Sequence, residues 1–200
     1  MIMEWTDRQR EIIIKTASLI AQYGIQEFTI KNLSKRMELS EAAIYRHFDS
    51  KTDILSNVID YLELVSDKYL FDGSNEQLPP LEKVKFFILS RFRLFNQHPD
   101  LAYIMFNGNI FQNDLDLACK MFKLMEKHRS YLENNLMKAK EDSKISINID
   151  KDNLFLILIG PVRLLINQWI LSKSAFDLEE KGAILLQKIE ELIYNRSGDD

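Results

Sequence analysis

The stretch from Thr29 to Lys51, TIKNLSKRMELSEAAIYRHFDSK, constrains the fold more than any other part of the chain. Thr29, Ser40 and Ser50 are favoured helix N-caps, and each is followed by a helix-forming run. Ile44 and Phe48 are one helical turn apart and predict an inward face. The sequence therefore predicts two short helices joined by a tight turn, with a further helix starting at Lys51.

The composition and the capping residues of the rest of the chain are typical of long helices. Among 200 residues there are only 6 Gly and 4 Pro, which favours helices over a turn-rich β fold. Thr6 and Gln9 match a capping box, and Gly24 stops a helix predicted over Asp7–Tyr23. The helix that begins at Lys51 is predicted to end near Tyr69. Later helices are expected over Leu81–Gln97, Asp100–Asn107, Leu115–Ala139, Lys151–Ser174 and Leu178–Asn195.

The expected fold class is all-α, with about nine helices. We expect a three-helix head in residues 1–51, with its helix-turn-helix at about 29–48, and a helical body in residues 52–200. Lys144–Asp150 alternates like a strand but has no partner strand, so we expect a loop there. No Pro-, Gly- or Ser-rich linker separates head from body, so movement in the body is expected to pass rigidly to the head.

Composition and termini indicate a cytoplasmic protein. Cys119 is the only cysteine, so an intrachain disulfide is impossible, and we expect it to be a small buried side chain. The N-terminus lacks the pattern of a signal peptide. The most apolar stretch, Leu154–Leu171, contains Arg163, which is costly in lipid, so a buried helix is expected and not a membrane span.

The net charge of −4 conceals a local basic region. Phe28–Lys51 holds five Lys and Arg against three Asp and Glu, while the rest of the chain is acidic. Neutralising nucleic-acid phosphates requires a basic surface and not a basic protein. A short helix of this size also fits the major groove of DNA.

The outward face of the second short helix suits base edges and phosphates. Its side chains are Glu41, Ala42, Tyr45 and Arg46. The small Ala42 and Ala43 allow close approach, and a methyl can contact a thymine methyl. The Tyr45 hydroxyl suits a phosphate oxygen, and Arg46 can fork to guanine or to phosphate. Glu41 would repel DNA unless it accepts from a cytosine amino group or pairs with a lysine.

Four further residues complete the predicted contact surface. They are Thr29, Lys31, His47 and Lys51. His47 can donate to phosphate, Lys51 lies in a first helical turn that already favours an anion, and Thr29 and Lys31 can hold the opposite backbone. Taken singly, a tyrosine or histidine is more often a packing residue, and a lysine is more often only solvated. The agreement of the caps, the inward pair and the outward face favours DNA contact.

Residues 7–62 resemble the N-terminal domain of the tetracycline-repressor (TetR) family of transcriptional regulators. The resemblance is carried by Ile13, Ala17, Gly24, Phe28-Thr29, Leu33, Leu39-Ser40, Ile44–Phe48, Ser50-Lys51 and Ile54-Leu55. It implies phosphate contacts from Tyr45, His47 and Lys51. Lys31, Glu41, Ala42, Ala43 and Arg46 match positions that vary in role and include base contacts. One departure is Met37-Glu38, where a glycine often precedes the turn.

The same resemblance implies a homodimer that binds a double-stranded palindromic operator. The last two helices would pair with their copies in a four-helix interface, although they could also simply complete a core. The expected interface residues are Leu158, Val162, Leu165, Trp169, Leu186, Ile189 and Ile193.

The middle helices are rich in Phe and Met, a pattern that usually marks a core. The resemblance raises the expectation of a pocket for an apolar effector such as a fatty acyl derivative or a drug. Its expected lining is Phe87, Arg91, Phe95, Met105, Phe106, Phe122, Met125 and Arg163. The arginines are candidates to hold a carboxylate, or they form ordinary ion pairs. The expected mechanism is repression of transcription that ends when the effector binds. The sequence does not distinguish a repressor from an activator.

Two other functional classes are disfavoured. An enzyme is not expected, because the three histidines lack metal-ligand spacing and there is no phosphate-binding loop or nucleophile motif. No cofactor or metal is therefore expected. A helical protein-interaction module without sequence-specific DNA binding is the alternative, and failure to bind any DNA at moderate salt would favour it.

Overall fold

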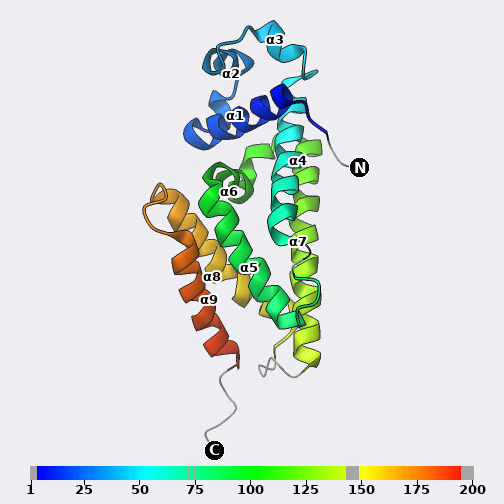
Figure 1. Cartoon of the computed structure of the whole chain (residues 1–200), viewed down its shortest axis with the longest axis vertical. Coiled ribbons are helices and arrows are strands. Elements are labelled where there is room, and N and C mark those ends of the chain that lie inside the picture. Colours follow the sequence, from blue (N-terminus) through cyan, green and yellow to red (C-terminus); the bar gives the residue numbers. More distant parts are fainter. Residues whose placement is uncertain (1–3, 72, 74, 143–148, 195–200) are drawn as a thin grey trace, which may run out of the picture. The chain divides into compact units, whose positions relative to one another are not determined.

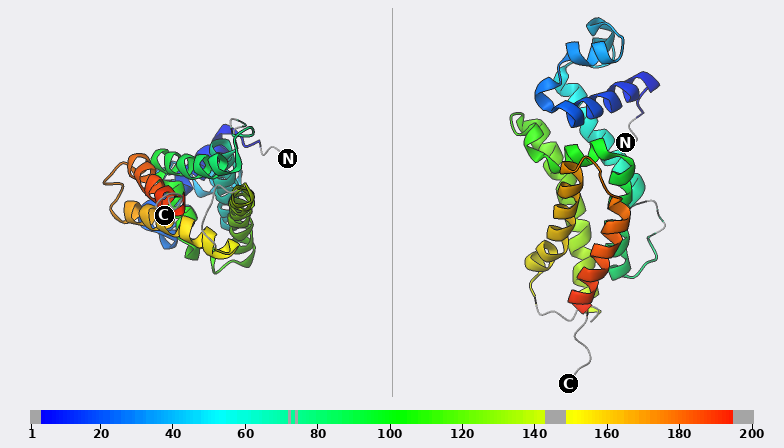
Figure 2. Two further views of the ribbon diagram at one scale, coloured as in Figure 1. Left: turned by 90° about the horizontal axis from the view of Figure 1, so that it is seen from below. Right: turned by 90° about the vertical axis from the view of Figure 1, so that its left-hand side faces the viewer.

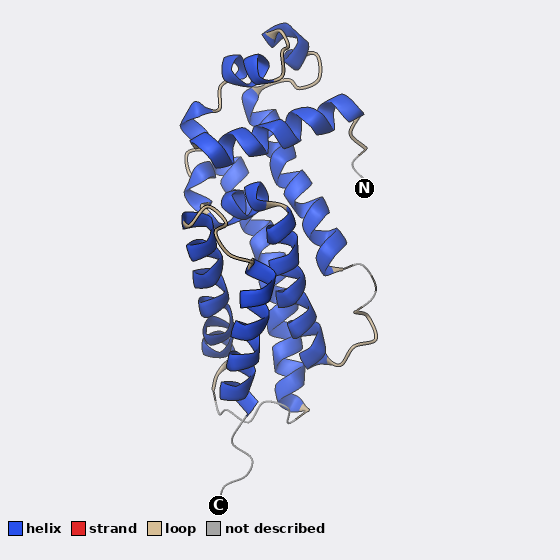
Figure 3. Ribbon diagram, turned by 60° about the vertical axis from the view of Figure 1, so that its left-hand side comes forward, coloured by secondary structure: helices blue, strands red, loops and turns tan. Residues whose placement is uncertain are grey.

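The computed structural model describes residues 4–71, 73, 75–142 and 149–194. These residues form nine α-helices and two 3-10 turns and contain no strand (Figures 1 and 3). The elements are α1 Asp7–Tyr23, η1 Ile25–Glu27, α2 Ile30–Arg36, α3 Glu41–Tyr45, α4 Lys51–Leu70, α5 Pro80–Gln97, α6 Pro99–Phe106, η2 Gly108–Phe111, α7 Leu115–Glu141, α8 Lys151–Leu171 and α9 Leu178–Tyr194. The all-α prediction is confirmed.

Contacts group the chain into two compact units. Unit 1 comprises the described residues up to Val65 together with Asp100–Leu124, and unit 2 comprises Ser66–Pro99 together with the described residues from Met125 onward. Helices α4 and α7 each continue from one unit into the other. The functional boundary expected near Lys51 stays a prediction.

Unit 1 is stabilised by the helix caps and by the apolar side chains at helical spacing that the sequence predicts. The Thr6 hydroxyl accepts from the Gln9 N–H at 3.2 Å, and the Gln9 side chain accepts from the Thr6 N–H at 3.0 Å, so α1 begins with a capping box. The core gathers apolar side chains that are all buried. They include Ile13, Ala17, Ile20, Phe28, Leu33, Ile44, Phe48, Ile54, Val58, Leu62, Ile104 and Met121.

Unit 2 is built chiefly on α5, α8 and α9, and α9 packs against both of the others (Figure 2). The turn between α8 and α9 is held by Trp169, whose indole N–H donates to the Phe176 carbonyl at 2.9 Å. Lys173 and Ser174 take left-handed φ values of 55° and 60°, so α8 ends at Leu171 and not at Ser174 as predicted. Left-handed backbone cannot continue a right-handed helix.

The closest packing within unit 2 is between α5 and α9 at Gly182. A Cβ at this position would lie 2.2 Å from Cδ2 of Phe92, and Phe92 is fully buried. Only glycine fits there without moving the ring.

We expect Gly182→Ala to lower the free energy of unfolding by about 1–3 kcal/mol, because overpacking a tight core forces side chains from their preferred rotamers. Urea unfolding of Gly182→Ala, Phe92→Leu and the double variant measures this. The double variant should lose less stability than the two single changes together, because the smaller leucine makes room for the methyl. A neutral Gly182→Ala would contradict the close approach.

Helix α8 is buried on one face only, which corrects the expectation of a buried helix. By length and composition it is the one helix in the described part that could cross a membrane, and only 28% of its most apolar window is buried. Leu156, Leu164 and Leu171 are 62%, 59% and 83% exposed. They fall on one side of the helix.

The expected dimer-interface residues of α8 and α9 are mostly buried within the chain. Leu158, Val162, Trp169, Leu186 and Ile189 are each at most 5% exposed, so they pack inside unit 2. Leu165 is partly buried, and the side chain of Ile193 lies outside the described residues. Their assignment to a dimer interface stays a prediction, and within one chain the five buried residues serve the core of unit 2. Apolar residues occur on all sides of α8 in the sequence. Periodicity alone therefore does not show which side of α8 is buried within the chain.

Three other expectations are affected. Cys119 is exposed and not buried, because its position on α7 turns outward. Residues 144–148 of the expected loop lie outside the described residues, as does Asn195. The remaining helix boundaries agree with prediction to within two residues, apart from the third helix.

Candidate DNA-binding site

The turn between α2 and α3 is built by local hydrogen bonds. The Thr29 hydroxyl accepts from the Asn32 N–H at 3.0 Å, and the Ser40 hydroxyl accepts from the Ala43 N–H at 3.1 Å, so both caps form as predicted. Between the helices Glu38 has a φ of 55°. This left-handed residue stands where a glycine is common in the TetR pattern, and the Leu39 N–H closes the turn on the Ser34 carbonyl at 2.9 Å.

Helix α3 turns one face inward and one outward. Ile44 is fully buried and Phe48 is 3% exposed, and these two fix the rotation of the segment. Tyr45 is 50% exposed. Glu41, Ala42 and Arg46 are also exposed, and Ala43 is partly buried. The inward and outward faces therefore lie as the sequence predicts.

The third helix is shorter than predicted. It ends at Tyr45, with Arg46 as the residue that follows it. His47 is partly buried in the turn, and its backbone carbonyl accepts from the Gln9 side chain of α1 at 3.2 Å. Arg46 and His47 are thus presented from a turn that α1 braces. Gln9 was predicted only as a capping residue, so this brace is a contact that the sequence analysis missed.

The remaining predicted contact residues surround α3. Thr29 and Lys31 are exposed at the start of α2. Lys51 is exposed in the first turn of α4, and its ammonium lies 5.1 Å from the centre of the Phe28 ring. The Ser50 hydroxyl accepts from the Asp53 N–H at 3.0 Å and starts α4 at this lysine. All nine predicted residues therefore belong to α2, α3 and the segment from α3 to the first turn of α4.

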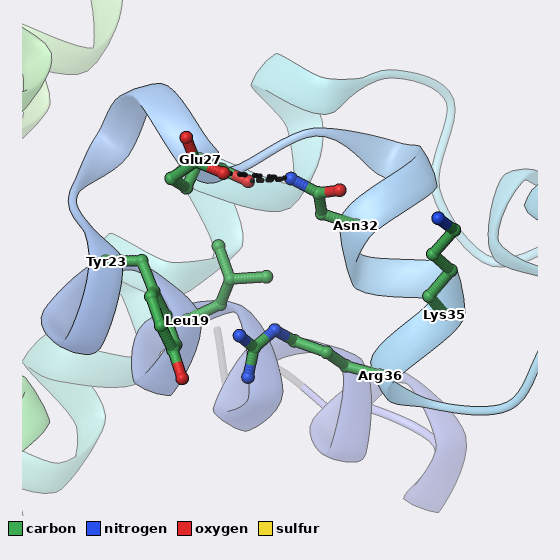
Figure 4. A pocket seen from close by; sticks show the side chains of 6 residues that line it. All are labelled: Leu19, Tyr23, Glu27, Asn32, Lys35 and Arg36. Atoms are coloured by element: carbon green, nitrogen blue, oxygen red, sulfur yellow. Dashed lines mark hydrogen bonds between the residues drawn. The ribbon is translucent and has the colours of Figure 1, made fainter.

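A surface hollow of about 410 Å³ lies between the end of α1 and α2 (Figure 4). Its lining residues are Leu19, Tyr23, Glu27, Asn32, Lys35 and Arg36. The Arg36 guanidinium stacks 4.2 Å from the centre of the Tyr23 ring, and the Asn32 side chain donates to the Glu27 carbonyl at 2.9 Å. These contacts tie α2 to α1 and to the η1 turn. The residues around the hollow therefore help to hold α2 in place.

Unit 2 contains a second cluster of interest, around Arg91 on α5. Arg91 is 7% exposed, and its guanidinium lies 5.0 Å and 5.5 Å from the ring centres of Phe87 and Phe95. Burial lowers the pKa of Arg91 to about 9, still above neutrality. Of the expected pocket residues, the structure brings these three together.

The other expected pocket residues differ in unit and in exposure. Met105, Phe106 and Phe122 belong to unit 1, and Phe122 is 61% exposed. Met125 is 37% exposed and Arg163 is also exposed. A pocket lined by these side chains stays a prediction.

His128 on α7 joins that cluster and was not predicted. Its Nδ1 lies 3.0 Å from Nη2 of Arg91, and it is 5% exposed. The two residues are far apart in sequence, so only their meeting in the fold reveals the pair. The one signal available was a histidine on the apolar side of a predicted helix.

Comparisons with known proteins agree with this geometry in both parts of the chain. The profile of the bacterial regulatory proteins of the tetR family matches residues 12–58, which contain α2, α3 and the turn between them. The profile of the C-terminal region of MAATS-type transcriptional repressors matches residues 79–194. The chain belongs to the TetR family. It is therefore a ligand-responsive, DNA-binding transcriptional regulator of the repressor type, a class of proteins that are not enzymes.

Relatives within the TetR family match almost the whole chain at low identity. The nucleoid occlusion factor SlmA of Vibrio vulnificus is 23% identical over 190 residues, which cover 92% of this chain and 97% of SlmA. The ketosteroid regulator KstR2 of Mycobacterium tuberculosis has a TM-score of 0.82 at 13% identity, covering 96% of this chain and 98% of its own. FadR of Bacillus subtilis in complex with stearoyl-CoA has a TM-score of 0.75 at 19% identity, covering 92% and 98%. At these identities the structural likeness shows the shared fold.

Proposed function

We propose that the chain binds a palindromic operator as a homodimer and represses transcription until an apolar acyl effector binds unit 2. The observation that carries this is the exposed α3 face beside Tyr45, set on two intact helix caps in a TetR-family head. It acts in the cytoplasm, where operator DNA is accessible.

The proposed DNA contacts follow the exposure of the side chains. Ala42, Ala43 and Arg46 face base edges, and Tyr45, His47 and Lys51 bind phosphates. Thr29 and Lys31 hold the backbone on the opposite side of the groove. Glu41 lies in the first turn of α3, where it stabilises the helix N-terminus and discriminates among bases.

The proposed dimer uses the exposed apolar residues of α8 and α9. They are Leu156, Ile157, Leu164, Leu171, Ile184 and Leu192, all at least 48% exposed. Several large apolar side chains exposed on neighbouring helices are typical of protein interfaces. A two-fold dimer presents two copies of α3 and so matches an inverted repeat.

The proposed effector is an acyl compound. Phe71, Phe87 and Tyr131 form a cluster of aromatic rings beside Arg91 and His128 in unit 2, with Phe71 and Tyr131 5.0 Å apart between ring centres. Apolar walls with a few convergent polar groups are typical of small-molecule sites. FadR of Bacillus subtilis, which has the same fold, binds stearoyl-CoA, and this supports testing that class first.

Selection of bound duplexes from a random DNA library tests the proposal. The wild type should enrich an inverted repeat, and stearoyl-CoA should release the enriched duplex. Enrichment without release by any acyl compound would contradict the effector class. No enrichment by the folded protein would contradict operator binding and favour a protein-interaction role.

Coupling between the two functions is expected to involve Lys120 on α7. Its ammonium donates to the Ser56 carbonyl at 3.1 Å, the Ser56 hydroxyl at 2.7 Å and the Asp60 carboxylate at 2.5 Å. All three contacts lie in unit 1, on the helix that begins at Lys51. Because α7 continues into unit 2, this clamp transmits a shift of α7 to α4.

We expect Lys120→Met to uncouple effector from operator. Coupling between two sites in such regulators is worth about 1–3 kcal/mol, or about 5- to 150-fold in affinity. The ratio of operator affinities without and with stearoyl-CoA should fall to within about 3-fold in Lys120→Met. Lys123→Met, an exposed lysine one turn away, is the matched control. An unchanged ratio in Lys120→Met would show that coupling bypasses this clamp.

A further inference from the structure

The Arg91–His128 contact fixes where the histidine carries its hydrogen. Nη2 of Arg91 lies 3.0 Å from Nδ1 of His128. A guanidinium has only donors, so Nδ1 must be the acceptor. A neutral imidazole with a bare Nδ1 carries its hydrogen on Nε2.

The surroundings keep this imidazole neutral. Burial lowers the pKa of His128 to about 2, and the positive charges of Arg91 and Lys127 act in the same direction. The ring lies edge-on to Phe87, with centres 5.7 Å apart, and 6.4 Å from Phe71. The histidine is therefore a fixed donor set among aromatic rings.

That donor is unused within the described residues. Nε2 of His128 is buried and makes no hydrogen bond there. Buried N–H groups in native proteins are almost always bonded, because desolvating a donor without a partner is costly. Among the residues that the structure describes, no acceptor therefore serves Nε2.

We propose that Nε2–H of His128 recognises an acceptor oxygen of the effector, a carbonyl or carboxylate oxygen joined to an apolar chain, and that Arg91 is the positioning residue that fixes the tautomer. This rests on the proposed function, in which unit 2 binds an apolar effector. The aromatic rings beside the imidazole provide the surface for the chain. A ligand that offers only donors, such as an alkylamine in its protonated ammonium form, cannot satisfy Nε2–H and is repelled by the positive charge of Arg91.

The tautomer is tested in the wild-type protein without a ligand. Nitrogen-15 NMR of histidine-labelled protein distinguishes the two neutral forms and the charged form. The chain has 3 histidines, and comparison with His128→Gln assigns the signal. We expect His128 to be neutral with its hydrogen on Nε2 from about pH 5 to pH 8. A charged ring or a hydrogen on Nδ1 would overturn the proposal.

Recognition is tested with three probes of equal chain length: dodecanoate, 2-tridecanone and dodecylamine. Direct binding to the full-length wild type is measured by calorimetry, and release of the selected operator by fluorescence anisotropy. We expect the two oxygen acceptors to bind at least about 10-fold more tightly than the amine. Binding by dodecanoate alone identifies a free carboxylate as the acceptor, and binding by both includes a carbonyl such as that of a thioester.

Two variants separate recognition from folding. His128→Phe keeps the ring shape without the donor and should weaken the two acceptor probes at least about 10-fold. His128→Gln retains an N–H at the Nε2 position and should recover much of that affinity. Thermal unfolding and operator binding without a probe check that both variants fold. Equal release from wild type and His128→Phe would overturn the proposal while leaving the effector function intact, whereas no release from wild type by any probe or by stearoyl-CoA would refute the effector function itself.

Discussion

Glutamate at both Leu171 and Ile184 is expected to convert the proposed dimer to monomers and to lower operator affinity by at least about 100-fold. Leu171 is 83% exposed and Ile184 is 55% exposed in the chain, so neither substitution empties the core. In an isologous interface each substitution occurs twice, and each buries an unpaired carboxylate. A monomer presents only one α3 and loses the second half-site.

Analytical ultracentrifugation and operator titration measure these two effects. Leu115→Glu is the matched control, since Leu115 is 84% exposed on α7 and should tolerate the charge. The double variant should keep a cooperative thermal unfolding transition, which shows that its monomer is folded. A double variant that remains dimeric would show that copies of the chain meet elsewhere.

The double variant Tyr45→Ala/Lys51→Ala is expected to lose operator affinity by about 100-fold at moderate salt. Tyr45 is half exposed and Lys51 is exposed, so their removal leaves the buried Ile44 and Phe48 in place. A dimer loses two lysine–phosphate contacts and two tyrosine–phosphate contacts. Each lysine contact releases about one counterion, so the slope of log affinity against log salt should fall by about 2.

Fluorescence anisotropy across a salt series checks the affinity and the slope together. Lys123→Ala should leave both unchanged, because Lys123 is an exposed lysine of α7 outside the helix-turn-helix. The loss should be similar for specific and random duplexes, because phosphate contacts carry little sequence information. An unchanged salt slope would mean that Lys51 does not contact phosphate.

The head was predictable because its signals are local. The caps at Thr6, Thr29, Ser40 and Ser50 each accept a hydrogen bond from a backbone N–H three residues away. Contacts over so short a distance can be predicted from the local sequence. The third helix was predicted too long, because Phe48 is buried by the turn after Tyr45 and not by helical continuation. Burial at helical spacing does not by itself prove a helix.

The candidate sites divide in the same way. The inward pair Ile44 and Phe48 left Tyr45 facing outward, so the proposed DNA-contact surface followed from periodicity. The effector cluster did not, because Phe122 and Met125 look like core residues in sequence and are exposed in the fold. An aromatic stripe in the sequence indicates an apolar helix face, but it does not show whether that face is buried by another helix or exposed.

By itself the sequence determined the helical class, most helix boundaries to within two residues and the register of the helix-turn-helix, because capping and periodicity act within a turn or two of the chain. Only the tertiary structure decided which side of α8 is covered, that Lys120 reaches Asp60, and that Arg91 meets His128. Those pairs join residues far apart in sequence, and their closeness depends on how whole helices pack. Packing sums many weak contacts that no short stretch of sequence contains.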